Sequence, residues 1–261
     1  MKDIIIFGGQ SNMQGENRGR TRYVVPECAE YKWLTDECVP LTDPVGEDIT
    51  FEGKAGCTFT DGTVQNEWLA THVAGSACYH GSTLVPPFAK AYTEACGRGV
   101  LAVPFAKGST FLHDWLPGTK AYEMMLRKVS GARKYAEDGA RVFFVFLQGE
   151  NDAVFSRTVD EYSKTLTALK DALVRDLGLE KFGVISVGHF CGDARDDAII
   201  EAQKRVCRTD GDFLLLTTLA SEIHEREECM EPGIPGHFSE KGLAVIGEDA
   251  GRTLGEYVKQ N

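Results

Sequence analysis

Five short runs of hydrophobic residues stand out along the chain, separated by segments of mixed polarity. They fall at residues 4–7, 100–105, 142–147, 183–187 and 213–216. Short apolar runs without strict alternation are typical of strands that are buried on both faces, as in a parallel sheet. We therefore predict five strands, of which the first lies at the N-terminus.

Helical periodicity appears between the later runs and after the last one. Four segments show it, at residues 121–136, 159–177, 194–207 and 239–258. The second segment, for example, repeats Tyr162, Leu166, Leu169 and Leu173 at intervals of three and four. Strands that alternate with helices of this length predict βαβ units and a mostly parallel sheet. We see no internal repeat or linker, so we expect a single domain.

Residues 16–82 break this alternation. They are rich in Gly, Cys, Thr and acidic residues and show little periodicity. We interpret them as a long irregular insertion after the first strand, placed near the carboxyl ends of the strands. Open parallel sheets bind ligands at those ends, so the segment is expected to form a pocket wall. The alternative is a surface insertion without function.

Composition and charge exclude several classes of protein. Of 261 residues, 43% are hydrophobic, which is enough for a buried core and argues against disorder. No apolar run approaches the roughly 18–20 residues of a membrane helix. A net charge of −11 argues against nucleic acid as a partner. The first apolar run lacks a cleavage site for a signal peptide, so we expect a cytoplasmic protein.

The eight cysteines indicate neither a metal site nor a disulfide framework. No pair has C-x-x-C spacing, and no cluster of His and Cys repeats at the intervals of metal ligands. In a cytoplasmic protein they are expected to be free thiols.

The first predicted strand runs directly into the sequence GGQSNMQG at residues 8–15. A serine that follows a strand between glycines sits on a tight turn, with its hydroxyl exposed. Its backbone N–H can point into the same space, as an oxyanion site requires. Ser11 is therefore a candidate nucleophile. The alternative, a phosphate-binding loop, lacks the usual glycine and lysine spacing.

Two further polar segments follow later predicted strands. The third strand ends in QGEND at residues 148–152, and the last helix is preceded by PGHFSEKG at residues 235–242. With a strand order of 2-1-3-4-5, strands 1 and 3 are neighbours, and Ser11 faces the QGEND turn across a crevice. Taken alone, the turn could be a hairpin or a helix cap, and His237 could be a capping or surface residue.

Taken together, these segments resemble the SGNH (GDSL-like) hydrolase superfamily. They are most similar to its carbohydrate-esterase branch, which contains acetylxylan esterases and sialate O-acetylesterases. The matching motifs are GQSNM at residues 9–13, GST at 108–110 with DWLPG at 114–118, QGEND at 148–152, and His237 with Ser239 and Gly242. The resemblance implies a three-layer α/β/α flavodoxin-like fold, here with a five-stranded parallel sheet.

The resemblance also implies roles for these residues. Ser11 would be the nucleophile, and His237 the general base that takes its proton. The backbone N–H groups of Ser11 and Gly108 would bind the oxyanion. A side-chain amide would be the third donor, either Asn151, as in the superfamily, or Gln148, as in the esterase branch. No metal or organic cofactor is expected.

The third member of the triad departs from the family pattern. Much of the superfamily carries an aspartate three residues before the histidine, where this chain has Ile234. We expect Glu150 to orient His237, because some members of the branch use the glutamate of QGE. Asp152 and Glu231 are weaker candidates, and a Ser–His pair assisted by a backbone carbonyl is the alternative.

The expected function is removal of O-acetyl groups from an acetylated carbohydrate, either a xylan-derived sugar or sialic acid. Trp115 could stack on a sugar ring, and Arg18, with Arg20 and Arg22, could meet an acidic sugar. Four residues of the insertion could also line the pocket: Asp48, Trp68, His72 and His80. The alternatives are a lipase- or thioesterase-like member of the superfamily and a non-catalytic carbohydrate-binding protein of the same fold.

Overall fold

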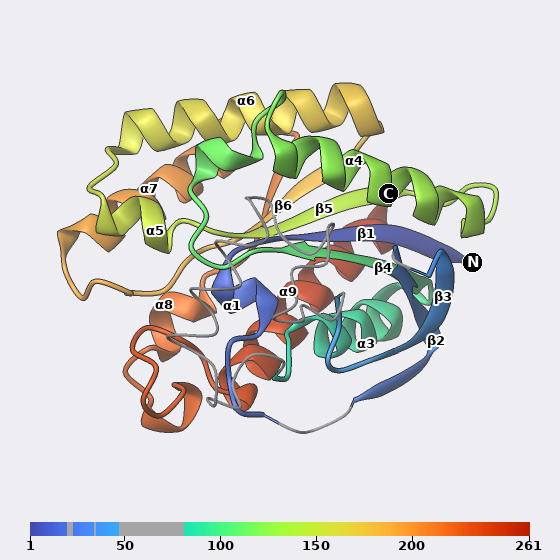
Figure 1. The fold of residues 1–261 in the computed structure, drawn as a ribbon, viewed down its shortest axis with the longest axis horizontal. Helices are drawn as coiled ribbons and strands as arrows, with labels where there is room; N and C mark the ends of the chain where they lie inside the picture. Colours follow the sequence, from blue (N-terminus) through green and yellow to red (C-terminus); the bar gives the residue numbers. More distant parts are fainter. Residues whose placement is uncertain (20–22, 34, 47–80) are drawn as a thin grey trace.

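The computed structural model describes residues 1–19, 23–33, 35–46 and 81–261, and it centres on one twisted sheet (Figure 1). Within this part of the chain the sheet has seven strands in the order β3-β2-β4-β1-β5-β6-β7. Their bounds are β1 Lys2–Gly9, β2 Val24–Lys32, β3 Glu37–Thr42, β4 Gly99–Ala106, β5 Val142–Leu147, β6 Lys181–Ile185 and β7 Phe213–Thr217.

The five strands predicted from the apolar runs are β1, β4, β5, β6 and β7. They pair in parallel in the order β4-β1-β5-β6-β7, which is the expected order 2-1-3-4-5. The chain passes from β1 to β4 on one side and later crosses to β5 on the other. The switch point therefore lies at β1, as ligand-binding sheets of this kind require.

The prediction of only five strands was wrong, because the segment expected to be irregular contributes β2 and β3. β2 pairs with β4 in parallel and with β3 in antiparallel orientation, with an irregularity between Val25 and Ala29. Charged residues conceal this strand in the sequence. Glu30 is buried, where its carboxylate pairs with Lys32 at 2.8 Å and accepts the Gly46 N–H at 2.6 Å.

Helices cover both faces of the sheet. In Figure 1, α4 and α6 lie over one face, and α3 and α9 lie over the other. The longer helices are α3 Val85–Cys96, α4 Lys120–Ala132, α6 Val159–Leu177, α7 Ala194–Thr209 and α9 Glu240–Gln260. Short helices are α1 Ser11–Gln14, α5 Glu150–Val154 and α8 Leu219–Ile223, with 3₁₀ turns at Leu112–Trp115, Arg133–Tyr135 and Glu227–Cys229.

The four predicted helices are confirmed as α4, α6, α7 and α9. Side-chain caps explain where two of them begin. Thr158 and Glu161 form a capping box at the start of α6, and the Ser239 hydroxyl accepts the Gly242 N–H at the start of α9. Helix α3 was not predicted, since its first residues, Val85-Pro86-Pro87, do not reveal a periodic stripe.

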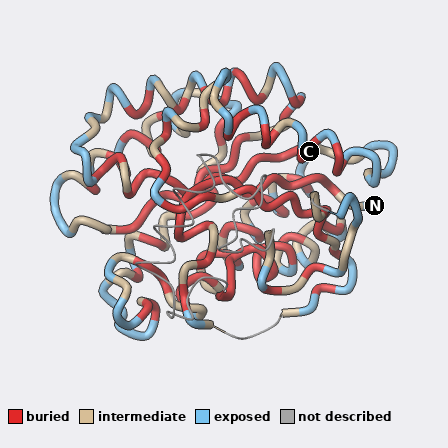
Figure 2. Tube along the Cα trace, in the orientation of Figure 1, coloured by how far each residue is buried: buried red, intermediate tan, exposed pale blue. Residues whose placement is uncertain are grey.

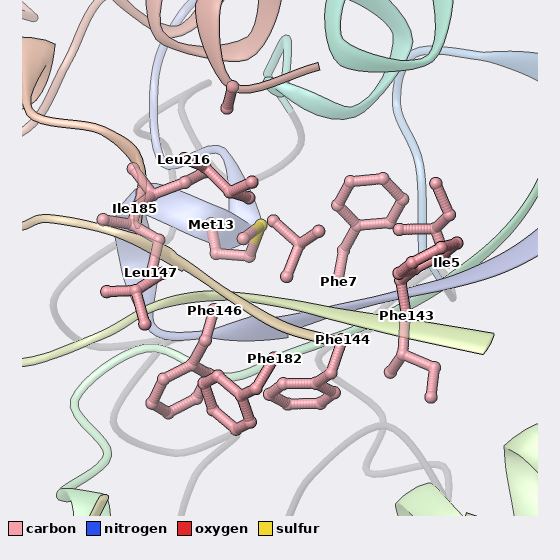
Figure 3. Packing of buried hydrophobic residues seen from close by; sticks show 14 of the residues in the cluster. Ile5, Phe7, Met13, Phe143, Phe144, Phe146, Leu147, Phe182, Ile185 and Leu216 are labelled. Atoms are coloured by element: carbon pink, nitrogen blue, oxygen red, sulfur yellow. The ribbon is translucent and has the colours of Figure 1, made fainter. Parts of the chain in front are cut away.

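Two layers of apolar side chains sandwich the sheet, which runs as a continuous buried band through the molecule (Figure 2). Phe144, Phe146 and Phe182 gather on one side, and Phe7 lies on the other (Figure 3). Rings on the first side contact one another, with centroids 4.9 Å apart for Phe144 and Phe182. Phe7 meets Phe88 of α3 edge to face at 5.1 Å. This packing fixes the strand ends that carry the polar residues.

Candidate active site

The turn after β1 places Ser11 at the carboxyl edge of the sheet. Gly9 has a φ of 145°, and a Cβ there would lie 2.0 Å from the carbonyl oxygen of Leu147 on β5. Only glycine therefore permits the chain to pass this close to its neighbour. Helix α1 begins at Ser11. Because the first N–H groups of a helix have no partner within it, the Ser11 N–H can serve a ligand.

His237 lies against Ser11 although 226 residues separate them in the sequence. Its Nε2 atom is 2.8 Å from the Ser11 hydroxyl oxygen, and its Nδ1 atom is 3.0 Å from the carbonyl oxygen of Pro235. A carbonyl oxygen can only accept, so Nδ1 carries the proton. Nε2 is then the acceptor for the serine hydroxyl. The arrangement holds the imidazole in the form that a general base needs.

Glu150 does not orient His237 directly, which corrects the expectation from sequence. Its Oε1 atom accepts a hydrogen bond of 2.9 Å from the side-chain amide of Asn12. Its Oε2 atom is buried and has no hydrogen-bond partner within the described residues. Burial raises the pKa of this carboxyl above its usual range. At Nδ1 of His237 the structure instead has the Pro235 carbonyl, the alternative that the sequence left open.

The other two carboxylates considered for the triad have different partners. Asp152 accepts hydrogen bonds from Gln148 Nε2 at 2.6 Å and from the Leu112 N–H at 2.9 Å. Glu231 lies 4.0 Å from the guanidinium of Arg18. The contacts of both carboxylates are therefore with residues other than Ser11 and His237.

Gly108 follows β4 and lies beside the nucleophile. A Cβ at this position would be 3.6 Å from the Cβ of Ser11. Its N–H donates to the side-chain oxygen of Gln14 at 2.8 Å. A substrate carbonyl that used this N–H would have to displace Gln14. The Gly108 N–H thus has the position expected of an oxyanion donor and is engaged by an internal acceptor.

The two candidate side-chain amides differ in how many of their hydrogens are already used in hydrogen bonds. Gln148 is buried, and its Nε2 donates to the carbonyl of Thr110 at 3.1 Å as well as to Asp152. Both of its hydrogens are thus used within the protein fold. Asn151 is partly exposed, and its Nδ2 donates to the carbonyl of Ser109 at 3.1 Å, which leaves one hydrogen for a ligand. Within the described residues, Asn151 is therefore the amide that keeps a hydrogen for a ligand, and Gln148 does not.

Of the two weaker substrate candidates, Trp115 does not line the site, and a substrate contact by Arg18 stays a prediction. Trp115 is fully buried, where it packs on Phe105 and Phe146 and donates to the Thr110 hydroxyl at 3.2 Å, so it cannot stack on a sugar. Arg18 is exposed and donates to the carbonyl of Pro232. Arg20, Arg22, Asp48, Trp68, His72 and His80 lie outside the described residues.

Sequence reasoning missed four polar residues of the site. Asn12 could have been found, since it adjoins Ser11 in the GQSNM motif. Gln14, Glu16 and Lys107 carried no such signal, because their proximity arises only when α1 meets the end of β4. The Oε2 atom of Glu16 lies 3.5 Å from Nε2 of His237. Lys107 is 2% exposed although it carries an ammonium group.

The described residues contain no candidate metal site and no candidate membrane span. Within them, no group of three or more His, Cys, Asp or Glu residues could hold a metal ion. No helix in the same part of the chain is long and apolar enough to cross a membrane. The six described cysteines form no disulfide, and Cys57 and Cys78 lie outside the described ranges.

Comparison with known proteins adds a family-level match. The model of the SASA family, described as carbohydrate esterase, sialic acid-specific acetylesterase, matches residues 1–218. This range contains Ser11, Gly108 and the QGEND turn and ends before His237. A probable carbohydrate esterase of Arabidopsis thaliana is 27% identical over 211 residues, covering 77% of this chain and 74% of that protein.

Solved structures share the fold. The X-ray structure of the same Arabidopsis thaliana protein superposes with a TM-score of 0.69 at 16% identity, covering 97% of this chain and 98% of that one. NanS superposes with a TM-score of 0.66 at 14% identity, covering 99% and 97%. A lipase/acylhydrolase from Enterococcus faecalis gives 0.54 at 13% identity, covering 98% and 97%.

Proposed function

The chain belongs to the SASA family of carbohydrate esterases and is a carboxylic ester hydrolase, and we propose that it removes acetyl groups from an acetylated sugar through an acyl-enzyme on Ser11. One observation carries the proposal. Nε2 of His237 accepts from the Ser11 hydroxyl at 2.8 Å while its Nδ1 is held by the Pro235 carbonyl. This pair can work without a carboxylate in direct contact with the imidazole.

In the first half of the reaction, the Ser11 oxygen attacks the acetyl carbonyl carbon while Nε2 of His237 takes the hydroxyl proton. The negative charge that develops on the carbonyl oxygen is stabilised by the N–H groups of Ser11 and Gly108 and by the Asn151 amide. The tetrahedral intermediate then collapses, the bond to the sugar oxygen breaks, and His237 returns the proton to that oxygen. The deacetylated sugar leaves, and Ser11 carries the acetyl group.

In the second half, a water molecule takes the place of the sugar. His237 removes a proton from the water, the resulting hydroxide attacks the acetyl carbon, and the same donors stabilise the oxyanion. When the bond to Ser11 breaks, its oxygen recovers the proton from His237. Acetate is released, and the free enzyme is restored. Burial of Ser11 and His237, which are 6% and 8% exposed, strengthens these electrostatic interactions.

We propose that the substrate is the acetyl ester of a sugar. Membership of the carbohydrate-esterase family supports this proposal. The close approach of the Gly108 backbone to Ser11 supports an acyl group as short as acetyl. The xylan-derived sugars and sialic acid are the two sugar classes that we propose to compare directly.

The proposal is tested by assaying the wild type, Ser11→Ala and His237→Ala on two esters. These are p-nitrophenyl acetate and p-nitrophenyl octanoate. We expect the acetate to be the better substrate, with both variants reduced to background. Acetate release from acetylated xylose and from O-acetyl sialic acid then identifies the sugar class. A preference for octanoate would instead support a lipase-like activity, and a Ser11→Ala variant as active as the wild type would overturn the mechanism.

A further inference from the structure

A carboxylate that the mechanism does not use lies between the general base and the oxyanion glycine. Glu16 follows α1, and its N–H donates to the Ser11 carbonyl at 3.2 Å, which ties its backbone to the nucleophile. Its Oε2 atom is 3.5 Å from Nε2 of His237. Its Oε1 atom would lie 2.6 Å from a Cβ at Gly108. The carboxylate therefore lines the space directly beside Ser11.

Lys107 supplies the compensating charge. It follows β4, and its N–H donates to the Gly9 carbonyl at 2.9 Å, which holds its backbone against β1. Its Nζ atom is buried without a hydrogen-bond partner within the described residues. Burial lowers the pKa of this ammonium to about 8, and attraction to Glu16 opposes that shift. Burial likewise raises the pKa of Glu16, while His237 and Lys107 favour its charged form.

The position of Glu16 relative to His237 shows which part of a substrate it meets. During acyl transfer, Nε2 of His237 gives its proton to the leaving alcohol oxygen, so that oxygen must lie next to Nε2. Oε2 of Glu16 flanks the same nitrogen. A group on the carbon adjacent to the one that bears the leaving oxygen is therefore within reach of the carboxylate. The side chain of Glu16 is 25% exposed, so part of it is accessible to a ligand.

We propose that Glu16 accepts a hydrogen bond from the hydroxyl adjacent to the acetylated oxygen, so that the enzyme selects monoacetates of vicinal diols. The inference rests on the proposed esterase function and narrows its substrate class. A carboxylate can only accept, and a sugar hydroxyl can donate. An ether or a second ester at this position would cover the Glu16 carboxylate without giving it a hydrogen bond, and a carboxylate there would be repelled.

The test uses two small esters that differ only in this hydroxyl. The wild type is assayed on 2-hydroxyethyl acetate and on 2-methoxyethyl acetate, and kcat/KM is measured for each. Hydrogen bonds to charged groups contribute about 1.5–3 kcal/mol, so we expect a preference of about ten- to hundredfold for the hydroxy ester. In Glu16→Leu this preference should disappear, and in Glu16→Gln, which keeps a neutral acceptor, it should be intermediate.

Glu228→Gln is the matched control, because Glu228 is exposed and pairs with Lys241 on the surface. It should keep the wild-type preference, and melting temperatures confirm that all variants are folded. An unchanged preference in Glu16→Leu would overturn the proposal. Equal losses of Glu16→Leu on both esters would overturn it too, since they would place Glu16 in acyl transfer itself. Wild-type inactivity on every acetate, p-nitrophenyl acetate included, would instead refute the esterase function.

Discussion

The side-chain amide of Asn12 donates a buried hydrogen bond of 2.9 Å to the carboxylate of Glu150. The same amide nitrogen lies 3.3 Å from the Gly236 carbonyl, and the Asn12 oxygen accepts the Phe238 N–H at 3.1 Å. Asn12 therefore holds the residues on both sides of His237. Glu150 is thus linked to the histidine loop through Asn12, and no hydrogen bond joins it to the imidazole within the described residues.

We predict that Asn12→Ala lowers kcat by about ten- to hundredfold, because the loop that carries His237 loses both hydrogen bonds that Asn12 makes with it. Glu150→Gln keeps an oxygen acceptor for Asn12 and should lower kcat by less than tenfold. Steady-state kinetics on p-nitrophenyl acetate, with melting temperatures for both variants, measure these effects. A larger loss for Glu150→Gln than for Asn12→Ala would show that the carboxylate itself is required by His237.

Substitution of the two candidate amides should affect different properties, kcat for Asn151 and stability for Gln148. Loss of one oxyanion donor lowers kcat about 10²–10³-fold, and we expect Asn151→Ala to fall in that range with little change in stability. Gln148→Ala removes a buried residue that bonds Thr110 and Asp152, so we expect a lower free energy of unfolding. Urea denaturation and steady-state kinetics of both variants distinguish the two roles. The reverse pattern would make Gln148 the donor.

Gln14 accepts the N–H of Gly108, the group that we propose as an oxyanion donor. An ordinary hydrogen bond contributes about 0.5–1.5 kcal/mol net, so Gln14→Ala should raise kcat/KM on p-nitrophenyl acetate by about two- to tenfold. Gln14→Glu keeps the acceptor and adds charge, and it serves as the comparison that should lower kcat/KM. If Gln14→Ala is slower than the wild type, its amide helps the reaction and does not obstruct it.

Asp43, directly after β3, makes the stability depend on pH. Burial raises its pKa to about 7, although its Oδ1 accepts the N–H and hydroxyl of Thr83 at 3.0 and 2.8 Å. Between pH 4 and 7 the folded chain therefore keeps a proton that the unfolded chain has lost. Its contribution is complete at the acid end of this window and disappears as the pH rises through about 7.

The free energy of unfolding should thus fall between pH 5 and pH 8, with this carboxyl contributing at most about 4 kcal/mol over its whole titration. Asp43→Asn has no group to titrate and should show a flatter profile. Urea denaturation of both proteins across this range is the measurement. Parallel profiles for wild type and variant would assign the pH dependence to another group.

Local patterns in the sequence were sufficient for the central fold. Each of the five apolar runs became a parallel strand in the expected order, and each periodic segment became a helix, because burial on both faces or along one stripe leaves a direct signature. Strand β2 left no such signature. Its Glu30 pairs with Lys32 of the same strand, and the burial of Glu30 arises only in the folded sheet.

The active site, like the fold, was predicted from sequence only in part. The sequence by itself determined that Ser11 follows the first strand and that His237 lies between the last strand and the last helix, at the carboxyl edge of a parallel sheet. Only the tertiary structure decided that Pro235 holds the imidazole, that Asn12 stands between Glu150 and the histidine loop, and that Glu16 reaches His237. Such contacts depend on side-chain directions within a few ångströms, which residue type and spacing do not specify.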